Sequence, residues 1–286
     1  MTQWECLLQN LGDWQGSFTR FSPEGELIED IPTVVSLHGL NNNQTIRQII
    51  RRCPSDRPVE EKILEYSSLG RGVLFFENGA FSQGSIQLSP FGEFGAELGL
   101  IAGDRRLRLV QLFEDRKLTT ITLIRERLAD TTTPEPRQPS PNFAAIENKL
   151  KVEDLLGEWQ GEAITIYPDR RSPDTYPVQL QVTKNGNNRI TQQLTISQGN
   201  SIQVNSKARI EGSLLYFDEG SQFNQVLLLP DGASATCPQE VRSGQAFFLE
   251  AGWLLQPNLR QRLIRRYDDK GGWSSLTLVT ERKLQF

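Results

Sequence analysis

The chain has 286 residues, with 31 Lys and Arg against 35 Asp and Glu and a formal net charge of −4. This balance argues against nucleic-acid binding, which needs a strong excess of positive charge. No apolar run approaches the roughly 20 residues of a membrane helix, and the N-terminus lacks the basic and apolar regions of a signal peptide. Three widely spaced cysteines favour free thiols in a reducing compartment. We therefore expect a cytoplasmic protein without membrane insertion.

The chain begins with a short helix predicted over residues 2–10. Thr2 can cap this helix with Glu5 as the partner residue of a capping box. Short strand-like stretches follow, from residues 14–21 to residues 118–128, and turn residues separate them at regular intervals. Many short strands at this spacing predict an all-β sandwich or barrel.

A proline-rich segment, residues 131–142, divides the chain. Prolines at this density favour an extended segment that cannot join a central strand. The sequence therefore predicts a first domain over residues 1–130, a linker over residues 131–142 and a second domain over residues 143–286.

The second half repeats the order of the first. A helix is predicted over residues 143–155, and strands follow from residue 159 onward. Val178, Leu180 and Val182 alternate with polar residues, which is the pattern of a half-buried strand. Strands continue to residues 274–284.

One pentapeptide pattern, Gly-x-Trp-x-Gly, occurs at residues 12–16 and again 145 residues later, at residues 157–161. Each half also ends its last predicted strand with a Glu-Arg pair. Because an up-and-down barrel places its first strand beside its last, we expect an arginine to stack on each tryptophan. The residues expected to close the two barrels are Gly12, Trp14 and Arg127 in one half and Gly157, Trp159 and Arg282 in the other.

This arrangement resembles the lipocalin or calycin pattern, in which an arginine closes on the tryptophan of the first strand. The resemblance implies two tandem calycin-like antiparallel β-barrels that arose by internal duplication, with a short helix before each.

The longer sequence around the first copy resembles a narrower group. It comprises Leu-Leu-Gln-Asn-Leu-Gly-Asp-Trp-Gln-Gly-Ser-Phe at residues 7–18 and Phe-Ser-Pro at residues 21–23. It is similar to a cyanobacterial family labelled as a domain of unknown function. Its plant chloroplast relatives are the biogenesis factors required for ATP synthase. The resemblance implies a non-enzymatic factor whose barrels bind F1 subunits, with the β and γ subunits as expected partners. It identifies no partner-contacting residue.

The sequence contains few residues or motifs that could carry out catalysis. Because His38 is the only histidine, we expect neither a histidine-based triad nor a multi-histidine metal site, and we interpret His38 as structural. The cysteines lack CxxC spacing, and no phosphate-binding loop motif occurs. The sequence predicts no enzyme activity, no metal and no cofactor.

The densest basic run is Arg260, Arg262, Arg265 and Arg266. It has two interpretations: an ordinary exposed strand face, or a docking patch for an acidic partner surface. The phenylalanines at residues 75, 76, 81, 91 and 94 favour core and barrel lining. One alternative function stays open, a carrier that holds a tetrapyrrole or fatty acid in the barrel interior.

Overall fold

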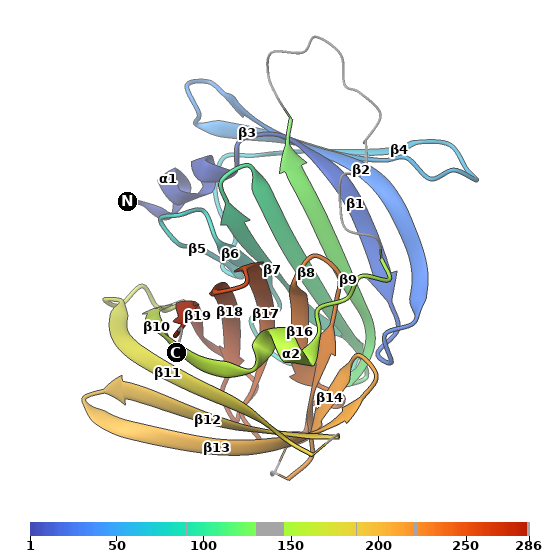
Figure 1. Cartoon of the computed structure of the whole chain (residues 1–286). Coiled ribbons are helices and arrows are strands. Elements are labelled where there is room, and N and C mark those ends of the chain that lie inside the picture. The colour runs from blue at the N-terminus through green and yellow to red at the C-terminus, as the bar shows by residue number, and fades with distance from the viewer. Residues whose placement is uncertain (90, 130–145, 187, 220–221, 285–286) are drawn as a thin grey trace.

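The structure is an all-β fold of two antiparallel sheets (Figure 1), which confirms the predicted class. The computed structural model describes residues 1–89, 91–129, 146–186, 188–219 and 222–284. The predicted linker, residues 131–142, lies outside the described residues, so the domain limits stay a prediction. None of the helices in the described parts is long and apolar enough to cross a membrane.

The first half is a nine-stranded sheet in the order β4-β3-β2-β1-β9-β8-β7-β6-β5. Two short helices precede it, α1 (Gln3–Leu7) and η1 (Leu8–Asn10). The capping box of Thr2 and Glu5 is confirmed. The strands are β1 (Gly12–Phe21), β2 (Leu27–Leu40), β3 (Thr45–Arg52), β4 (Glu60–Tyr66), β5 (Val73–Phe75), β6 (Phe81–Gly84), β7 (Glu93–Ala102), β8 (Arg105–Glu114) and β9 (Lys117–Leu128).

The second half is a closed barrel of consecutive strands from β10 to β19. Its helix α2 (Val152–Leu155) has only four residues, so the described part of the predicted helical segment is mostly non-helical. The strands are β10 (Gly157–Ile166), β11 (Asp174–Asn185), β12 (Arg189–Gln198), β13 (Asn200–Glu211), β14 (Leu214–Phe217), β15 (Asn224–Leu228), β16 (Ala233–Pro238), β17 (Phe247–Gln256), β18 (Leu259–Tyr267) and β19 (Trp273–Lys283).

The Gly-x-Trp-x-Gly pattern opens β1 and β10. Gly12 and Gly157 have φ values of 125° and 116°, which side chains other than glycine rarely adopt. The second glycine, Gly16 in the first half, lets β1 approach β9, because a Cβ there would collide with a backbone carbonyl. The first strand of each half pairs with the last, as expected.

The first half is not the closed barrel that the sequence led us to expect. Six residues, 67–72, connect β4 to β5, and these two strands do not pair in the described structure. At the corresponding place in the second half, a two-residue turn joins β13 to β14, and Gly212 in this turn has a φ of 60°. A two-residue turn forces its flanking strands into a hairpin, whereas a longer connection does not. The sheet with the two-residue turn is therefore the one that closes, and the sheet with the six-residue connection stays open.

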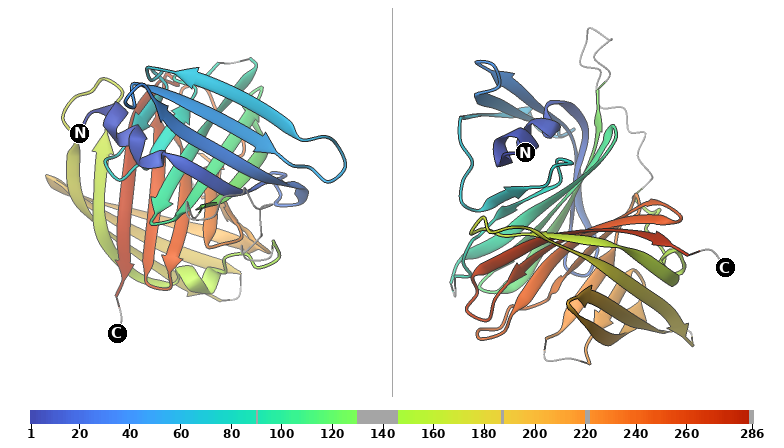
Figure 2. Two further views of the ribbon diagram at one scale, coloured as in Figure 1. Left: turned by 90° about the horizontal axis from the view of Figure 1, so that it is seen from above. Right: turned by 90° about the vertical axis from the view of Figure 1, so that its left-hand side faces the viewer.

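The two halves pack back to back and share the largest hydrophobic core of the molecule. Strands β7 and β8 lie against β16, β17 and β18 (Figures 1 and 2). Four aromatic rings meet at the centre, with centroids 4.7–5.8 Å apart. They are Phe94 and Phe113 from the first half and Phe247 and Tyr267 from the second. Both contributions come from equivalent strands, so the repeats pack as a pseudo-symmetric pair.

Polar side chains also cross this interface in both directions. Gln111 on β8 donates to backbone carbonyls of the second half at 3.2 and 3.3 Å. Arg265 on β18 donates to Gly72 O, Ser82 Oγ and Ser85 O of the first half at 3.0–3.2 Å. Because buried polar groups are costly unless they are hydrogen-bonded, these contacts favour one relative placement of the halves. The halves are two related sheets around a common core, of which the second closes into a barrel and the first stays open.

Candidate functional site

A buried charged cluster surrounds Trp14 in the first half. The Trp14 indole Nε1 donates to Asn10 O at 3.0 Å, and the Arg106 guanidinium lies 4.3 Å from the ring centroid. Arg106 comes from β8, and its Nε donates to Glu126 Oε2 on β9 at 2.6 Å. Trp14, Arg106 and Glu126 are all almost fully buried. The tryptophan that the sequence singled out is therefore part of a desolvated ion-pair cluster.

A second arginine completes this cluster. Arg108 donates to both oxygens of Glu126 at 2.8 and 2.9 Å and to Glu97 Oε1 at 2.6 Å. Alternate residues of a strand share a face, so Arg106 and Arg108 both point to the Trp14 side of β8. Two carboxylates thus balance two guanidiniums, which limits the cost of burying them.

The second half repeats the cluster around Trp159. Arg260 lies 4.5 Å from the ring centroid, and its Nε donates to Glu281 Oε1 at 2.8 Å. Arg262 bridges Glu281 and Glu250 at 2.9 and 3.3 Å. The duplication therefore extends to five side chains, which come from the first and the last three strands of each half.

The central carboxylates of the two clusters, Glu126 and Glu281, stay ionised. Burial would raise the pKa of Glu126, but Arg106 and Arg108 outweigh it and hold the pKa below its ordinary value. The same balance lowers the pKa of Glu281 beside Arg262 and Arg260. Burial lowers the pKa of Arg106. These groups stabilise one another's charges, and neither Glu126 nor Glu281 has the raised carboxyl pKa of a general acid.

The arginines expected on the tryptophans are not the ones that stack there. Arg127 pairs in register with Gln15, so it lies on the sheet face opposite Trp14, where it is half exposed beside Asp104. Arg282 pairs with Gln160 in the same way and is exposed. The inward residue of each Glu-Arg pair is the glutamate, and the stacking arginine comes from the preceding strand.

The sequence carries a signal for the arginines that do stack on the tryptophans. Arg106-x-Arg108 and Arg260-x-Arg262 occupy the same place in the two repeats, one strand before the Glu-Arg pair. Two arginines two residues apart on a strand share a face.

The arginine run of β18 is not an exposed docking stripe. Arg260 and Arg262 belong to the Trp159 cluster, and Arg265 has no exposed surface because it fills the interface between the halves. Only Arg266 is exposed, with its guanidinium 5.5 Å from the Phe248 ring centroid. Both interpretations of the run assumed exposure, and they are wrong for three of its four arginines.

Of the five phenylalanines expected in the core, Phe91 is 82% exposed.

The remaining reactive side chains do not converge. His38 is exposed and lies 3.1 Å from Asp13. Cys6 and Cys237 are buried, and burial raises the pKa of both thiols. Within the described residues no group of three or more His, Cys, Asp or Glu side chains could hold a metal ion.

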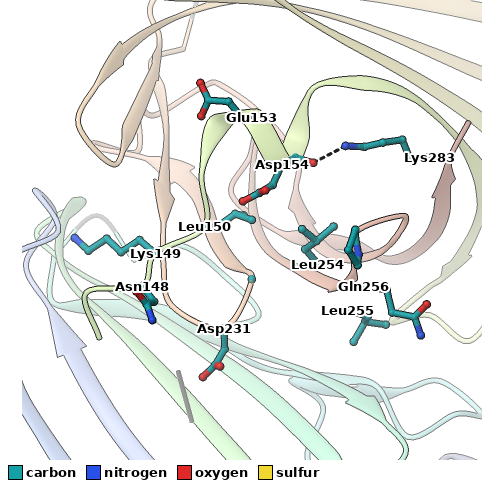
Figure 3. Close-up of a pocket in the computed structure, with 12 residues that line it drawn as sticks. Asn148, Lys149, Leu150, Glu153, Asp154, Asp231, Leu254, Leu255, Gln256 and Lys283 are labelled. Atoms are coloured by element: carbon teal, nitrogen blue, oxygen red, sulfur yellow. Dashed lines mark hydrogen bonds between the residues drawn. The ribbon is translucent and has the colours of Figure 1, made fainter. Parts of the chain in front are cut away.

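A cavity of about 460 Å³ lies beside helix α2, between Asp231, Leu254 and Lys283 (Figure 3). Leu150, Leu254 and Leu255 supply its apolar lining, and Lys283 donates to the Asp154 carbonyl at its rim at 2.8 Å. The volume suits a small ligand. Its other charged groups are already engaged: Glu153 pairs with Lys184, and Asp231 with Arg125. The cavity therefore offers no convergent set of polar groups that would select a ligand.

The inner wall of the barrel is open at another place. Trp159 pairs with Leu180, Leu180 with Leu194, and Leu194 with Val204, so all four side chains share the inner face. Trp159 is fully buried, yet Val204 is 47% exposed and the neighbouring inner residue Ile202 is 56% exposed. Solvent thus reaches the inner face along β13.

Two family models divide the chain between them. Residues 1–131 match the model described as domain of unknown function (DUF3598), N-terminal. Residues 147–284 match the model described as biogenesis factor required for ATP synthase 1, C-terminal domain. No curated protein matches the chain.

Among solved structures, a protein of unknown function from the DUF3598 family of Nostoc punctiforme PCC 73102 is 50% identical, with a TM-score of 0.87. The match covers 99% of this chain and 100% of that one. An S-type phycobiliprotein lyase from Guillardia theta is 14% identical, with a TM-score of 0.36, over 47% of this chain and 90% of that one. The close match over both full lengths shows that the chain belongs to the DUF3598 family.

Proposed function

We propose that the protein is a non-enzymatic, cytoplasmic protein-binding factor that assists assembly of the F1 part of ATP synthase. The observation that carries the proposal is the match of residues 147–284 to the C-terminal domain of an ATP synthase biogenesis factor. The buried charges agree with it, because both arginine–glutamate clusters are internally paired and serve the fold. Under this proposal the F1 β and γ subunits are the partners.

The direct test is a calorimetric titration of the full chain against purified F1 β subunit and, separately, F1 γ subunit. We expect saturable binding of at least one of them. An unrelated nucleotide-binding protein of similar size serves as the control for nonspecific association. In cells that carry the gene, its deletion should lower the amount of assembled F1. If neither subunit binds and F1 accumulates normally without the gene, the proposal fails.

A carrier of a small apolar ligand is the second candidate. The exposed aliphatic side chains of Ile202 and Val204 on the inner barrel face favour it. Titration with a tetrapyrrole and with a long-chain fatty acid would test it. Val204→Asp should abolish binding, whereas Gln203→Asp, which changes the adjacent outward-facing residue, should not. Stoichiometric ligand binding together with no F1 subunit binding would replace the assembly proposal with the carrier.

A further inference from the structure

Strand β13 of the closed barrel has a long free edge. Its first edge pairs with β12 over the full length from Asn200 to Arg209. On its second edge, β14 pairs only with Arg209, Ile210 and Glu211. Among the described residues no strand borders the stretch from Asn200 to Ala208 on that side. The barrel thus closes through three residues of β13, and the rest of the strand presents unpaired backbone donors and acceptors.

From Asn200 to Ser206 this edge carries none of the usual protection, and Lys207 is the first charged residue along it. Charged residues and prolines on edge strands normally prevent pairing with other chains. From Ile190 to Ser206, which covers most of the β12–β13 hairpin, the sequence has neither a charged residue nor a proline. Glutamine, asparagine, serine and threonine alternate there with aliphatic residues, and such a segment favours strand pairing.

The first half provides an internal comparison. Strand β4 occupies the equivalent place beside β3, and its second edge is also without a strand partner in the described structure. That strand carries four charged residues among its seven, and three of its carboxylates pair with β3. They are Glu61 with Arg51 at 2.7 Å, Glu65 with Arg47 at 2.6 Å and Glu60 with Arg52 at 4.0 Å. The fold thus leaves an edge in both halves, but the edge in the first half carries charged residues along its length, whereas the edge of β13 is uncharged from Asn200 to Ser206.

Both faces of the β13 edge are accessible. Gln203 and Asn205 are exposed on the outer face, and Ile202 and Val204 are about half exposed on the inner face. A strand added here would cover the two aliphatic side chains with its own inward residues. It would also continue the barrel wall beside β12 and β13, which lie at the outer margin of the molecule (Figure 1).

We propose that the free edge of β13, from Asn200 to Ser206, binds an extended, uncharged segment of a protein partner by β-strand addition. The backbone edge supplies the hydrogen bonds, and Ile202 and Val204 select a segment with aliphatic residues at alternate positions. The inference rests on the proposed function only in taking the partner to be a protein.

The probe is a synthetic peptide with the sequence Ile-Thr-Gln-Gln-Leu-Thr-Ile-Ser of residues 190–197. This is the sequence of β12, which already pairs with the opposite edge of β13. Added to the full chain, it should bind saturably and slow hydrogen exchange of the backbone amides of residues 201–207. Peptide binding without slower exchange in this segment, or no binding at millimolar concentration, would overturn the proposal. Slow exchange that depends on protein concentration without peptide would instead identify a second copy as the occupant, and would also overturn it.

A variant with charged residues on the β13 edge gives a second measurement. In this variant, Gln203→Lys and Asn205→Lys place two lysines on the edge. It should bind a peptide with glutamates in place of Gln193 and Thr195 about tenfold more tightly than a peptide with lysines there. Opposite charges on paired strands attract one another, whereas like charges repel. The control, Gln179→Lys with Gln181→Lys, changes exposed residues of β11, whose two edges are both paired. It should show no such preference, and an equal preference in both variants would count against the edge.

The same variants separate this inference from the proposed function. If the wild-type chain and the β13 variant bind an F1 subunit equally, the assembly proposal stands and the edge is not its binding surface. If no F1 subunit binds while the peptide protects residues 201–207, the edge is a docking site for a different protein.

Discussion

The two halves keep the same buried cluster but differ in the closure of their sheets. Trp14 with Arg106 and Glu126, and Trp159 with Arg260 and Glu281, are related residue by residue. One cluster lies in an open sheet and the other in a closed barrel. All its members come from the first strand and the last three strands of each half, which form one continuous band in both. The cluster therefore depends on this band and not on closure of the barrel.

The largest expected effect comes from separating the halves. Residues 1–131 alone, or residues 146–286 alone, should aggregate or fail to fold, because each would expose its side of the shared core. Expressed together, the two pieces should form a soluble complex. The measurements are solubility, circular dichroism and molecular mass. A cooperative thermal transition of either piece as a monomer would show that the halves are independent domains.

Removing the central carboxylate should destabilise both halves strongly. Glu126→Ala and Glu281→Ala each leave two buried arginines with too little compensating charge, and each should lower the free energy of unfolding by about 3–5 kcal/mol. The exposed pair of Glu65 and Arg47 provides the control, since Glu65→Ala should cost about 0–1 kcal/mol. Urea titration measures all three. A much smaller cost for Glu126→Ala than for Glu281→Ala would show that the open sheet admits water to its cluster.

Acid should weaken the protein through the same carboxylates. Because the folded-state pKa values of Glu126 and Glu281 lie below their unfolded values, their contribution to stability is fully present above about pH 4.3 and is lost as the pH falls toward the folded values. The urea midpoint should therefore decline below about pH 4.3. In Glu126→Gln and Glu281→Gln this decline should be shallower, and an unchanged slope in both would contradict the assignment.

The interface offers a smaller test. Tyr267 accepts a hydrogen bond from Arg265 at 2.7 Å and donates to Ser85 O at 2.9 Å, whereas its counterpart in the first half, Phe113, has no hydroxyl. Tyr267→Phe should cost about 1–3 kcal/mol, because it leaves buried polar groups without a partner. The half-buried Tyr216 on β14 is the control, and Tyr216→Phe should cost much less. Equal costs for both changes would mean that the Tyr267 hydroxyl does not contribute to the interface.

Much of the architecture could be predicted from local patterns. The duplicated Gly-x-Trp-x-Gly, the short strands and the capping box of Thr2 each depend on residues close together in the chain, and all three predictions are confirmed. The family resemblance is confirmed as well. The candidate site was predicted less well, because the exposure of the β18 arginines depends on what packs over them.

The sequence by itself determined the all-β class, the two related halves and the pairing of the first strand with the last in each. Only the tertiary structure decided which residue of each Glu-Arg pair faces inward, because side chains alternate along a strand and a shift of one residue reverses the face. It also decided that the halves share a core and that Arg265 lies between them. Closure of one sheet and not the other follows from how β13 and β14 join and where α1 packs. Gln3 of α1 bonds the Phe75 backbone at 2.7 and 2.9 Å, where a neighbouring strand would otherwise pair with β5. Such contacts join residues far apart in the chain, and no local pattern records them.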